Sequence, residues 1–119
     1  KKKYVVLLND INDANVLDKY LLKWKKIPKD NQLQSLEKKL YEMTKVYDKN
    51  KINFIKNNFN KNSINYMLRS EIYCDSYKKK CPLIINEEKV YRDYGHLTNN
   101  GAKIFSKNLN QLILKLINN

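Results

Sequence analysis

His96 is the only histidine in the sequence, and Asp93 stands three residues before it. A carboxylate at this spacing in a turn can accept a hydrogen bond from one ring nitrogen and fix the tautomer of the imidazole. The other nitrogen is then free to act as a base near neutral pH. The spacing therefore marks Asp93 and His96 as a candidate acid–base pair.

The elements that would position this pair follow from the hydrophobic pattern. Residues 3–8 form a short continuous apolar run, which is typical of a strand buried on both faces. Apolar side chains at helical spacing predict amphipathic helices over residues 13–26 and 32–47. Residues 51–56 give a weak strand pattern, and the Asn-rich residues 57–62 predict a loop.

The C-terminal part of the sequence has clearer turn and helix-cap signals. Residues 83–85 and 90–91 read as short extended pieces around a turn at residues 86–89. Thr98 is a good N-cap for a final helix that runs to about residue 117. Its apolar face consists of Phe105, Leu109, Leu112, Ile113 and Leu116.

Strands that alternate with helices predict an α/β layered fold with a parallel sheet. The sequence holds few strand candidates, whereas open sheets usually have about 4–6 strands. No internal repeat or low-complexity linker divides the chain. We therefore expect residues 1–119 to be a single domain or the C-terminal fragment of a larger one.

The string from Val90 to Ala102, followed by an amphipathic helix, resembles the last block of SGNH/GDSL-type hydrolases. It is similar to the version written Y-x-D-x-x-H-L-S-x-x-G-A, found in extracytoplasmic SGNH domains joined to membrane O-acyltransferases of cell-surface polysaccharides. The resemblance implies a three-layer, flavodoxin-like α/β fold, of which this chain carries the C-terminal part. It also implies that His96 is the general base and Asp93 its partner. Thr98 stands where Ser is commoner in the family, a change that keeps the helix cap.

The nucleophile of that family is a Ser in a Gly-Asp-Ser block, and this sequence contains no such block. The serines at positions 35, 63, 70, 76 and 106 lack the strand-then-turn pattern that exposes a nucleophile. In one explanation, residues 4–10 are a later strand, and the nucleophile lies in a missing N-terminal segment or on a companion chain. In the other, residues 8–11 are a degenerate first block with Ile11 in place of Ser. We favour the first.

Two further features bear on the resemblance. Asn9 follows the first strand in a Leu-Leu-Asn-Asp string, where many SGNH enzymes place an Asn as an oxyanion donor. A polar turn that caps the next helix is the favoured role for it. Cys74 and Cys81 match a Cys pair that the family subgroup tends to carry before this block. As zinc ligands they lack partners, so a disulfide is the favoured interpretation, and it implies a periplasmic or cell-envelope location.

The chain is strongly basic, with a net charge of +12. Its 24 basic residues include only two arginines, Arg69 and Arg92, and the lysines are scattered. Specific phosphate and base recognition favours the planar guanidinium of Arg, so nucleic acid is not an expected partner. The percentage of charged residues and the absence of a long apolar run exclude a transmembrane span.

The resemblance thus implies O-acyl transfer to a cell-surface carbohydrate, with acetyl as the expected group, or hydrolysis of its esters by a Ser-His-Asp mechanism. Its implied partners are the carbohydrate, the segment that bears the nucleophile and a membrane acyltransferase domain. No metal and no cofactor is expected. The alternative is a catalytically inactive SGNH-like module that binds an acidic glycan or a protein partner through a basic, Tyr-rich surface.

Overall fold

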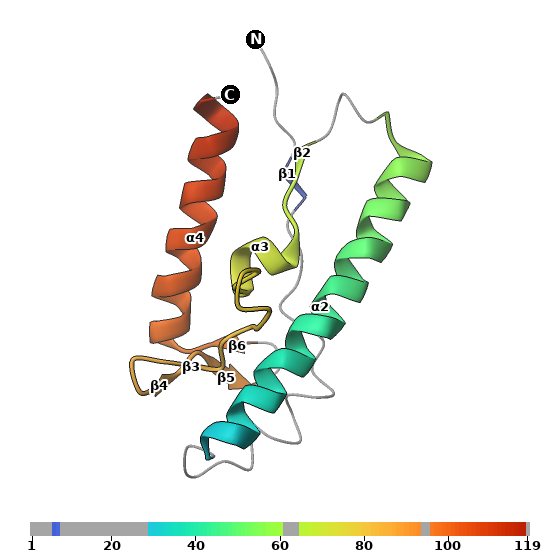
Figure 1. Ribbon diagram of the computed structural model, residues 1–119. Coiled ribbons are helices and arrows are strands. Elements are labelled where there is room, and N and C mark those ends of the chain that lie inside the picture. The colour runs from blue at the N-terminus through green and yellow to red at the C-terminus, as the bar shows by residue number, and fades with distance from the viewer. Residues whose placement is uncertain (1–5, 8–28, 61–64, 94–95, 119) are drawn as a thin grey trace.

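The computed structural model describes residues 6–7, 29–60, 65–93 and 96–118. Two long helices flank a short helix and three pairs of short strands (Figure 1). In chain order the elements are β1 (Val6–Leu7), α2 (Asp30–Asn58), β2 (Asn65–Tyr66), α3 (Arg69–Tyr73), β3 (Ile84–Ile85), β4 (Glu88–Lys89), β5 (Tyr91–Asp93), β6 (His96–Leu97) and α4 (Asn99–Asn118). In the described part of the chain, no helix is long and apolar enough to cross a membrane.

Helix α2 is longer than the sequence pattern predicts. The predicted helix over residues 32–47 is present, but α2 continues to Asn58 through the segment predicted as a strand over 51–56. That strand prediction is wrong. The inward positions of α2 recur at helical spacing along the whole element, so the same face stays buried to its last turns. The buried residues are Glu37, Leu40, Thr44, Asp48 and Ile55.

The predicted fold class is also wrong. The described strands form three separate two-stranded pairs, and the described residues contain no three-layer α/β SGNH fold with a parallel sheet. β1 and β2 pair in parallel over two residues each, whereas the β3/β4 and β5/β6 pairs are antiparallel. The physical reason is that residues 51–56 join a helix, and residues 84–97 pair locally through tight turns. Such short connections make hairpins and cannot make parallel crossovers.

The C-terminal predictions are confirmed in part. A turn lies within the predicted residues 86–89, but it is only Asn86 (φ 55°) and Glu87 (φ 64°), and Glu88 and Lys89 form β4 instead. Two successive positive φ values are the signature of the tight turns that join hairpin strands. Helix α4 begins directly after Thr98, as predicted, and ends within a residue of the expected end.

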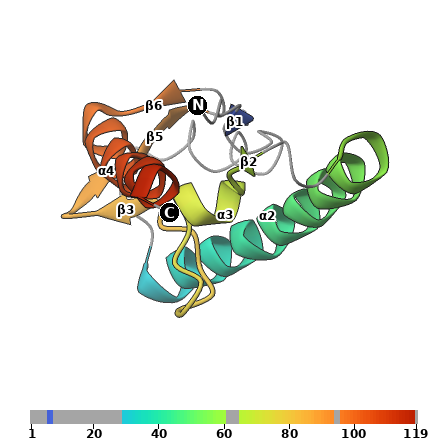
Figure 2. The same ribbon diagram turned by 90° about the horizontal axis from the view of Figure 1, so that it is seen from above.

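The core lies where α2, α3 and α4 meet the two hairpins (Figure 2). The ring of Phe105 on α4 is central to it. Its centroid lies 4.8 Å from that of Tyr73 and 5.9 Å from that of Tyr91. The buried cluster consists of Leu40, Met67, Ile72, Cys81, Leu83, Val90, Tyr91 and Phe105.

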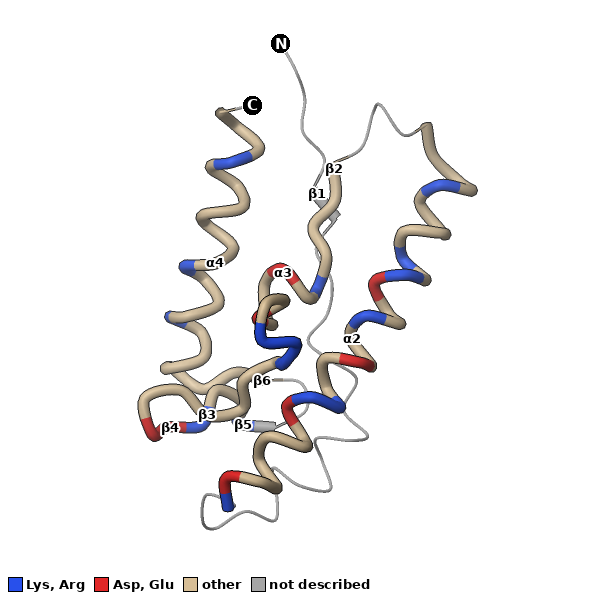
Figure 3. Tube along the Cα trace, viewed as in Figure 1, with Lys and Arg blue, Asp and Glu red and all other residues tan. Residues whose placement is uncertain are grey.

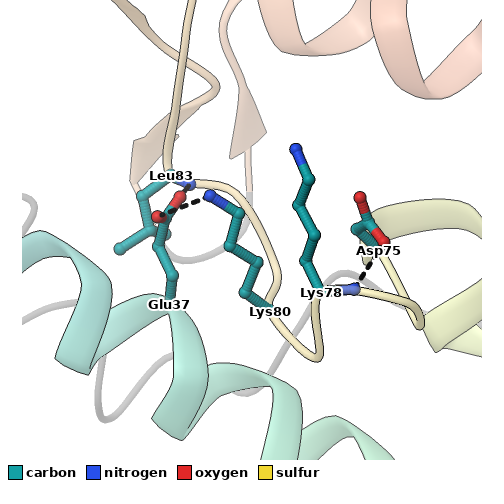
Figure 4. A network of polar contacts seen from close by, with 5 residues as sticks. All are labelled: Glu37, Asp75, Lys78, Lys80 and Leu83. Carbon is teal, nitrogen blue, oxygen red and sulfur yellow. Dashed lines mark hydrogen bonds and ion pairs between the residues drawn. The ribbon is translucent and has the colours of Figure 1, made fainter.

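A buried carboxylate joins α2 to the segment that leads into β3. Glu37 is 3% exposed, and its Oε2 accepts a 2.8 Å hydrogen bond from the Leu83 N–H (Figure 4). The backbone carbonyl of Glu37 accepts a second bond, of 3.1 Å, from the Cys81 N–H. Lys80 Nζ lies 3.8 Å from the other carboxylate oxygen. One residue of α2 therefore contacts Lys80, Cys81 and Leu83, on both sides of Pro82.

A second buried carboxylate of α2 accepts hydrogen bonds from the first backbone amides of α3. Asp48 is 1% exposed and accepts hydrogen bonds from the N–H groups of Arg69 (3.0 Å) and Ser70 (3.3 Å). These are the first amides of α3, which have no partners within the helix. Nearby, Lys51 donates a 2.9 Å hydrogen bond to the Met67 carbonyl. Burial lowers the pKa of Lys51, against the opposing effect of the Asp48 carboxylate.

We expect Glu37→Ala to lower the free energy of unfolding by about 2 kcal/mol, because it leaves the Leu83 N–H buried without an acceptor. Urea denaturation followed by circular dichroism measures the change. Lys80→Ala is the control, since its ion pair is partly exposed and contributes less than about 1 kcal/mol. Equal losses in the two variants would contradict the role assigned to the Leu83 hydrogen bond.

Candidate functional site

The β5/β6 hairpin brings the predicted acid–base pair together in the backbone. Asp93 and His96 are directly paired positions of this antiparallel hairpin, and Tyr91 pairs with Leu97. The register shifts between Tyr91 and Asp93, which marks an irregularity in β5. The side chain of His96 is exposed. The pairing therefore brings the backbones of the two residues to neighbouring positions.

The base of this hairpin is tied into the core. The Val90 N–H donates to the Leu83 carbonyl at 3.0 Å, and the Thr98 N–H donates to the Val90 carbonyl at 3.1 Å. Between these bonds, the Tyr91 side chain is fully buried against Phe105. The hairpin therefore cannot shift its register without exposing a large aromatic residue, since a slip of one position reverses which side chains face inward.

Thr98 joins the hairpin to α4. Its Oγ1 accepts a 3.0 Å hydrogen bond from the Gly101 N–H, as predicted for an N-cap residue. The same hydroxyl donates a 2.6 Å hydrogen bond to the Lys89 carbonyl. The Thr98 carbonyl accepts the Ala102 N–H at 2.8 Å and so starts the helix. One hydroxyl thus satisfies a free amide of α4 and fixes the helix against the end of β4.

Gly101 lets α4 approach the hairpin closely. A Cβ atom at this position would collide with the backbone carbonyl of Val90. Asn100 adds a polar contact, since its Nδ2 donates to the Ile85 carbonyl at 3.0 Å. Thr98, Asn100 and Gly101 therefore fix α4 against the strands, which accounts physically for these three residue types.

The predicted disulfide is confirmed. Cys74 and Cys81 are bonded, and both lie at the edges of ordered elements. The Cys74 N–H donates to the Ser70 carbonyl as α3 ends, and Cys81 is fully buried beside α2. The Thr44 hydroxyl on α2 lies 3.8 Å from the Cys81 sulfur. The bridge therefore links the end of α3 to the segment that Glu37 anchors.

Other predicted site residues are not brought to the hairpin. Asn9, the tentative oxyanion donor, lies outside the described residues. None of the described serines sits in a turn after a strand. Ser35 and Ser106 are exposed on α2 and α4, Ser70 is buried in α3, and Ser76 is exposed between the cysteines. Within the described ranges, no group of three His, Cys, Asp or Glu side chains could hold a metal ion.

Sequence reasoning missed the two buried carboxylates of α2. Glu37 has no predicted role and Asp48 lies beyond the predicted helix end, yet both lie on the buried face of α2. A signal was available, because positions 37, 40, 44 and 48 follow one helical face. A carboxylate that recurs on an apolar face indicates a buried group with dedicated hydrogen-bond donors.

Comparisons with models of protein families, with curated proteins and with solved structures find no match for this chain.

We expect Gly101→Ala to destabilise the protein by about 1–3 kcal/mol, because the added methyl group overlaps the Val90 carbonyl. Helix propensity alone would give the opposite sign, since Ala is about 1 kcal/mol better than Gly inside a helix. Thermal unfolding followed by circular dichroism measures the effect. Ser106→Ala, at an exposed position of the same helix, should change stability by less than about 0.5 kcal/mol. A stabilised Gly101→Ala variant would contradict the close approach.

Proposed function

We propose that Asp93 and His96 are the acid–base half of a Ser-His-Asp site that acts on O-acyl esters of a cell-surface carbohydrate. The serine would come from a segment that this sequence does not include. The observation that carries the proposal is the direct pairing of Asp93 with His96 in the β5/β6 hairpin, with the His96 side chain exposed. The resemblance of residues 90–102 to the last SGNH block supports the same assignment.

In the proposed reaction, the serine hydroxyl attacks the ester carbonyl while His96 takes its proton. The imidazolium then gives that proton to the leaving alcohol, and the acyl group remains on the serine. Water attacks this intermediate in hydrolysis, and a carbohydrate hydroxyl attacks it in transfer. In both cases His96 accepts the proton of the attacking group and returns it to the serine oxygen. Asp93 holds the ring orientation and stabilises the imidazolium.

The hairpin suits this task because several independent contacts fix its position. Buried Tyr91, the Thr98 cap and the close contact at Gly101 hold it from three sides. A base must be held close to its working geometry for efficient proton transfer, since small misplacements slow the reaction steeply. The proposal needs only this local support and a segment that delivers the serine, so it does not depend on a three-layer sheet.

The proposed setting is extracytoplasmic, in the periplasm or cell envelope. The disulfide supports it, because such bonds persist mainly in oxidising compartments. The proposed partners are the missing N-terminal segment or companion chain with the nucleophile, the carbohydrate substrate and a membrane acyltransferase domain.

The second candidate is a catalytically inactive module that binds an acidic glycan or a protein. The positions of the described serines favour it, because none is placed as a nucleophile. A complete protein that binds a glycan and turns over no ester would select this candidate.

The test is ester turnover by the natural protein that contains this chain, with a chromogenic aryl acetate as substrate. We expect His96→Ala to reduce kcat by about 10³-fold or more, because the serine loses its base. Asp93→Asn should also reduce kcat while leaving KM nearly unchanged.

The control is Lys107→Ala, which removes an exposed side chain of α4 and should leave turnover unchanged. Circular dichroism must show that His96→Ala keeps its helix content and melting temperature. Full turnover in the folded His96→Ala variant would overturn the assignment.

A further inference from the structure

The segment between the two cysteines, residues 75–80, forms a loop that we call the bridged loop. Asp75 and Lys80 exchange two backbone hydrogen bonds, of 2.8 and 3.1 Å, just inside the disulfide. The Lys78 N–H donates to Asp75 Oδ1 at 2.9 Å (Figure 4). Lys79 adopts a positive φ of 52°. A covalent bond and three hydrogen bonds thus define the shape of six residues.

The tip of the bridged loop contributes nothing to the core. Tyr77 is 95% exposed, and Lys78 and Lys79 are also exposed. At the base of the loop, in contrast, Lys80 turns toward Glu37 on α2 (Figure 4). Ordering a loop costs conformational entropy, and this loop is ordered without burying its tip. A tip that is already rigid loses little further freedom when a ligand binds.

The electrostatics of the tip favour an anion. Two carboxylates lie at the base of the loop: Asp75 accepts the Lys78 N–H, and Glu37 is paired with Lys80. The three lysines at positions 78–80 outnumber them. In the described structure, neither Lys78 nor Lys79 forms an ion pair. Lysines are also spread along α2 and α4 (Figure 3), so charge alone does not distinguish a surface. The bridged loop differs because two exposed lysines directly follow a tyrosine that is 95% exposed, in a segment that the disulfide closes.

We propose that the bridged loop is a binding surface for an acidic polysaccharide. Lys78 and Lys79 pair with the carboxylates of successive uronate-type sugars, and the ring of Tyr77 packs against a sugar face. Lysine ammonium groups act as point charges, so each can pair with a single carboxylate of a polymer, and a sugar ring between these carboxylates can pack against an exposed aromatic ring. The choice of a carbohydrate among polyanions rests on the proposed function.

The surface is separate from the acid–base pair. Seen from above, the bridged loop lies beside α2, on the side of the molecule opposite β5 and β6 (Figure 2). A polymer long enough to reach both places would be held at the loop and presented at the hairpin. Such an arrangement raises the effective concentration of acyl groups near His96 without adding contacts at the reacting centre.

The test measures binding of fluorescein-labelled polygalacturonate to the natural protein that contains this chain, with neutral dextran as the reference polymer. We expect Lys78→Gln/Lys79→Gln to weaken binding about tenfold, as expected for the loss of two exposed charge contacts. Tyr77→Ala should weaken it as well, whereas Tyr77→Phe should bind like the wild type because it keeps the ring. Added salt should weaken wild-type binding.

The matched control is Lys103→Gln/Lys107→Gln, which removes the same charge from exposed positions of α4. It should change the affinity by less than about twofold, because its lysines lie outside the loop. Equal weakening by the two double variants would overturn the proposal, since net charge would then explain binding. Tighter, loop-dependent binding of duplex DNA or of anionic lipid vesicles would overturn the choice of polysaccharide.

Because binding is measured without turnover, the two proposals fail separately. The His96→Ala variant should bind polygalacturonate like the wild type. Loss of loop-dependent binding with ester turnover intact would refute the bridged loop alone, and the reverse result would refute the acid–base assignment alone.

Discussion

The structure depends above all on the buried carboxylate of Glu37. Its Oε2 accepts the Leu83 N–H and its backbone carbonyl accepts the Cys81 N–H, so a single turn of α2 holds the chain on both sides of Pro82. A buried carboxylate is costly unless donors compensate it, and here the donors belong to a distant segment. Because the Glu37 carboxylate needs these donors, α2 is held against the segment that leads into the C-terminal strands, although Glu37 and Leu83 are 46 positions apart along the chain.

From this anchor the chain runs to two different surfaces. In one direction it forms the bridged loop, where the disulfide and the Asp75–Lys80 pairing shape a tip that projects into solvent. In the other it forms β3 to β6, which buried Tyr91 and the Thr98 cap fix against α4. The proposed chemistry and the proposed binding surface thus share one rigid support. On both surfaces, the side chains proposed to contact a ligand include exposed ones: His96 at the hairpin, and Tyr77, Lys78 and Lys79 on the bridged loop.

The errors and successes of the sequence predictions have a common physical origin. The turn after Ile85, the Thr98 cap and the final helix depend on neighbours within a few positions, so local residue types were enough to place them, although Glu88 and Lys89 of the predicted turn form β4. The strand predicted over 51–56 failed because Ile52 and Phe54 resemble an alternating pattern. In the structure, Ile55 continues the buried face of α2 and Phe54 is exposed. Which pattern prevails depends on the surface that covers the segment.

By itself, the sequence determined the short spacing between Asp93 and the sole histidine, the Cys pair available for a bridge, and the residues that fix α4 against the strands. Their spacing is short, and short spacing restricts geometry strongly. Only the tertiary structure decided the fold class, the length of α2 and the burial of Glu37 and Asp48. Those outcomes depend on contacts between residues far apart in the chain, because a carboxylate becomes an interior group only when a distant segment brings it hydrogen-bond donors.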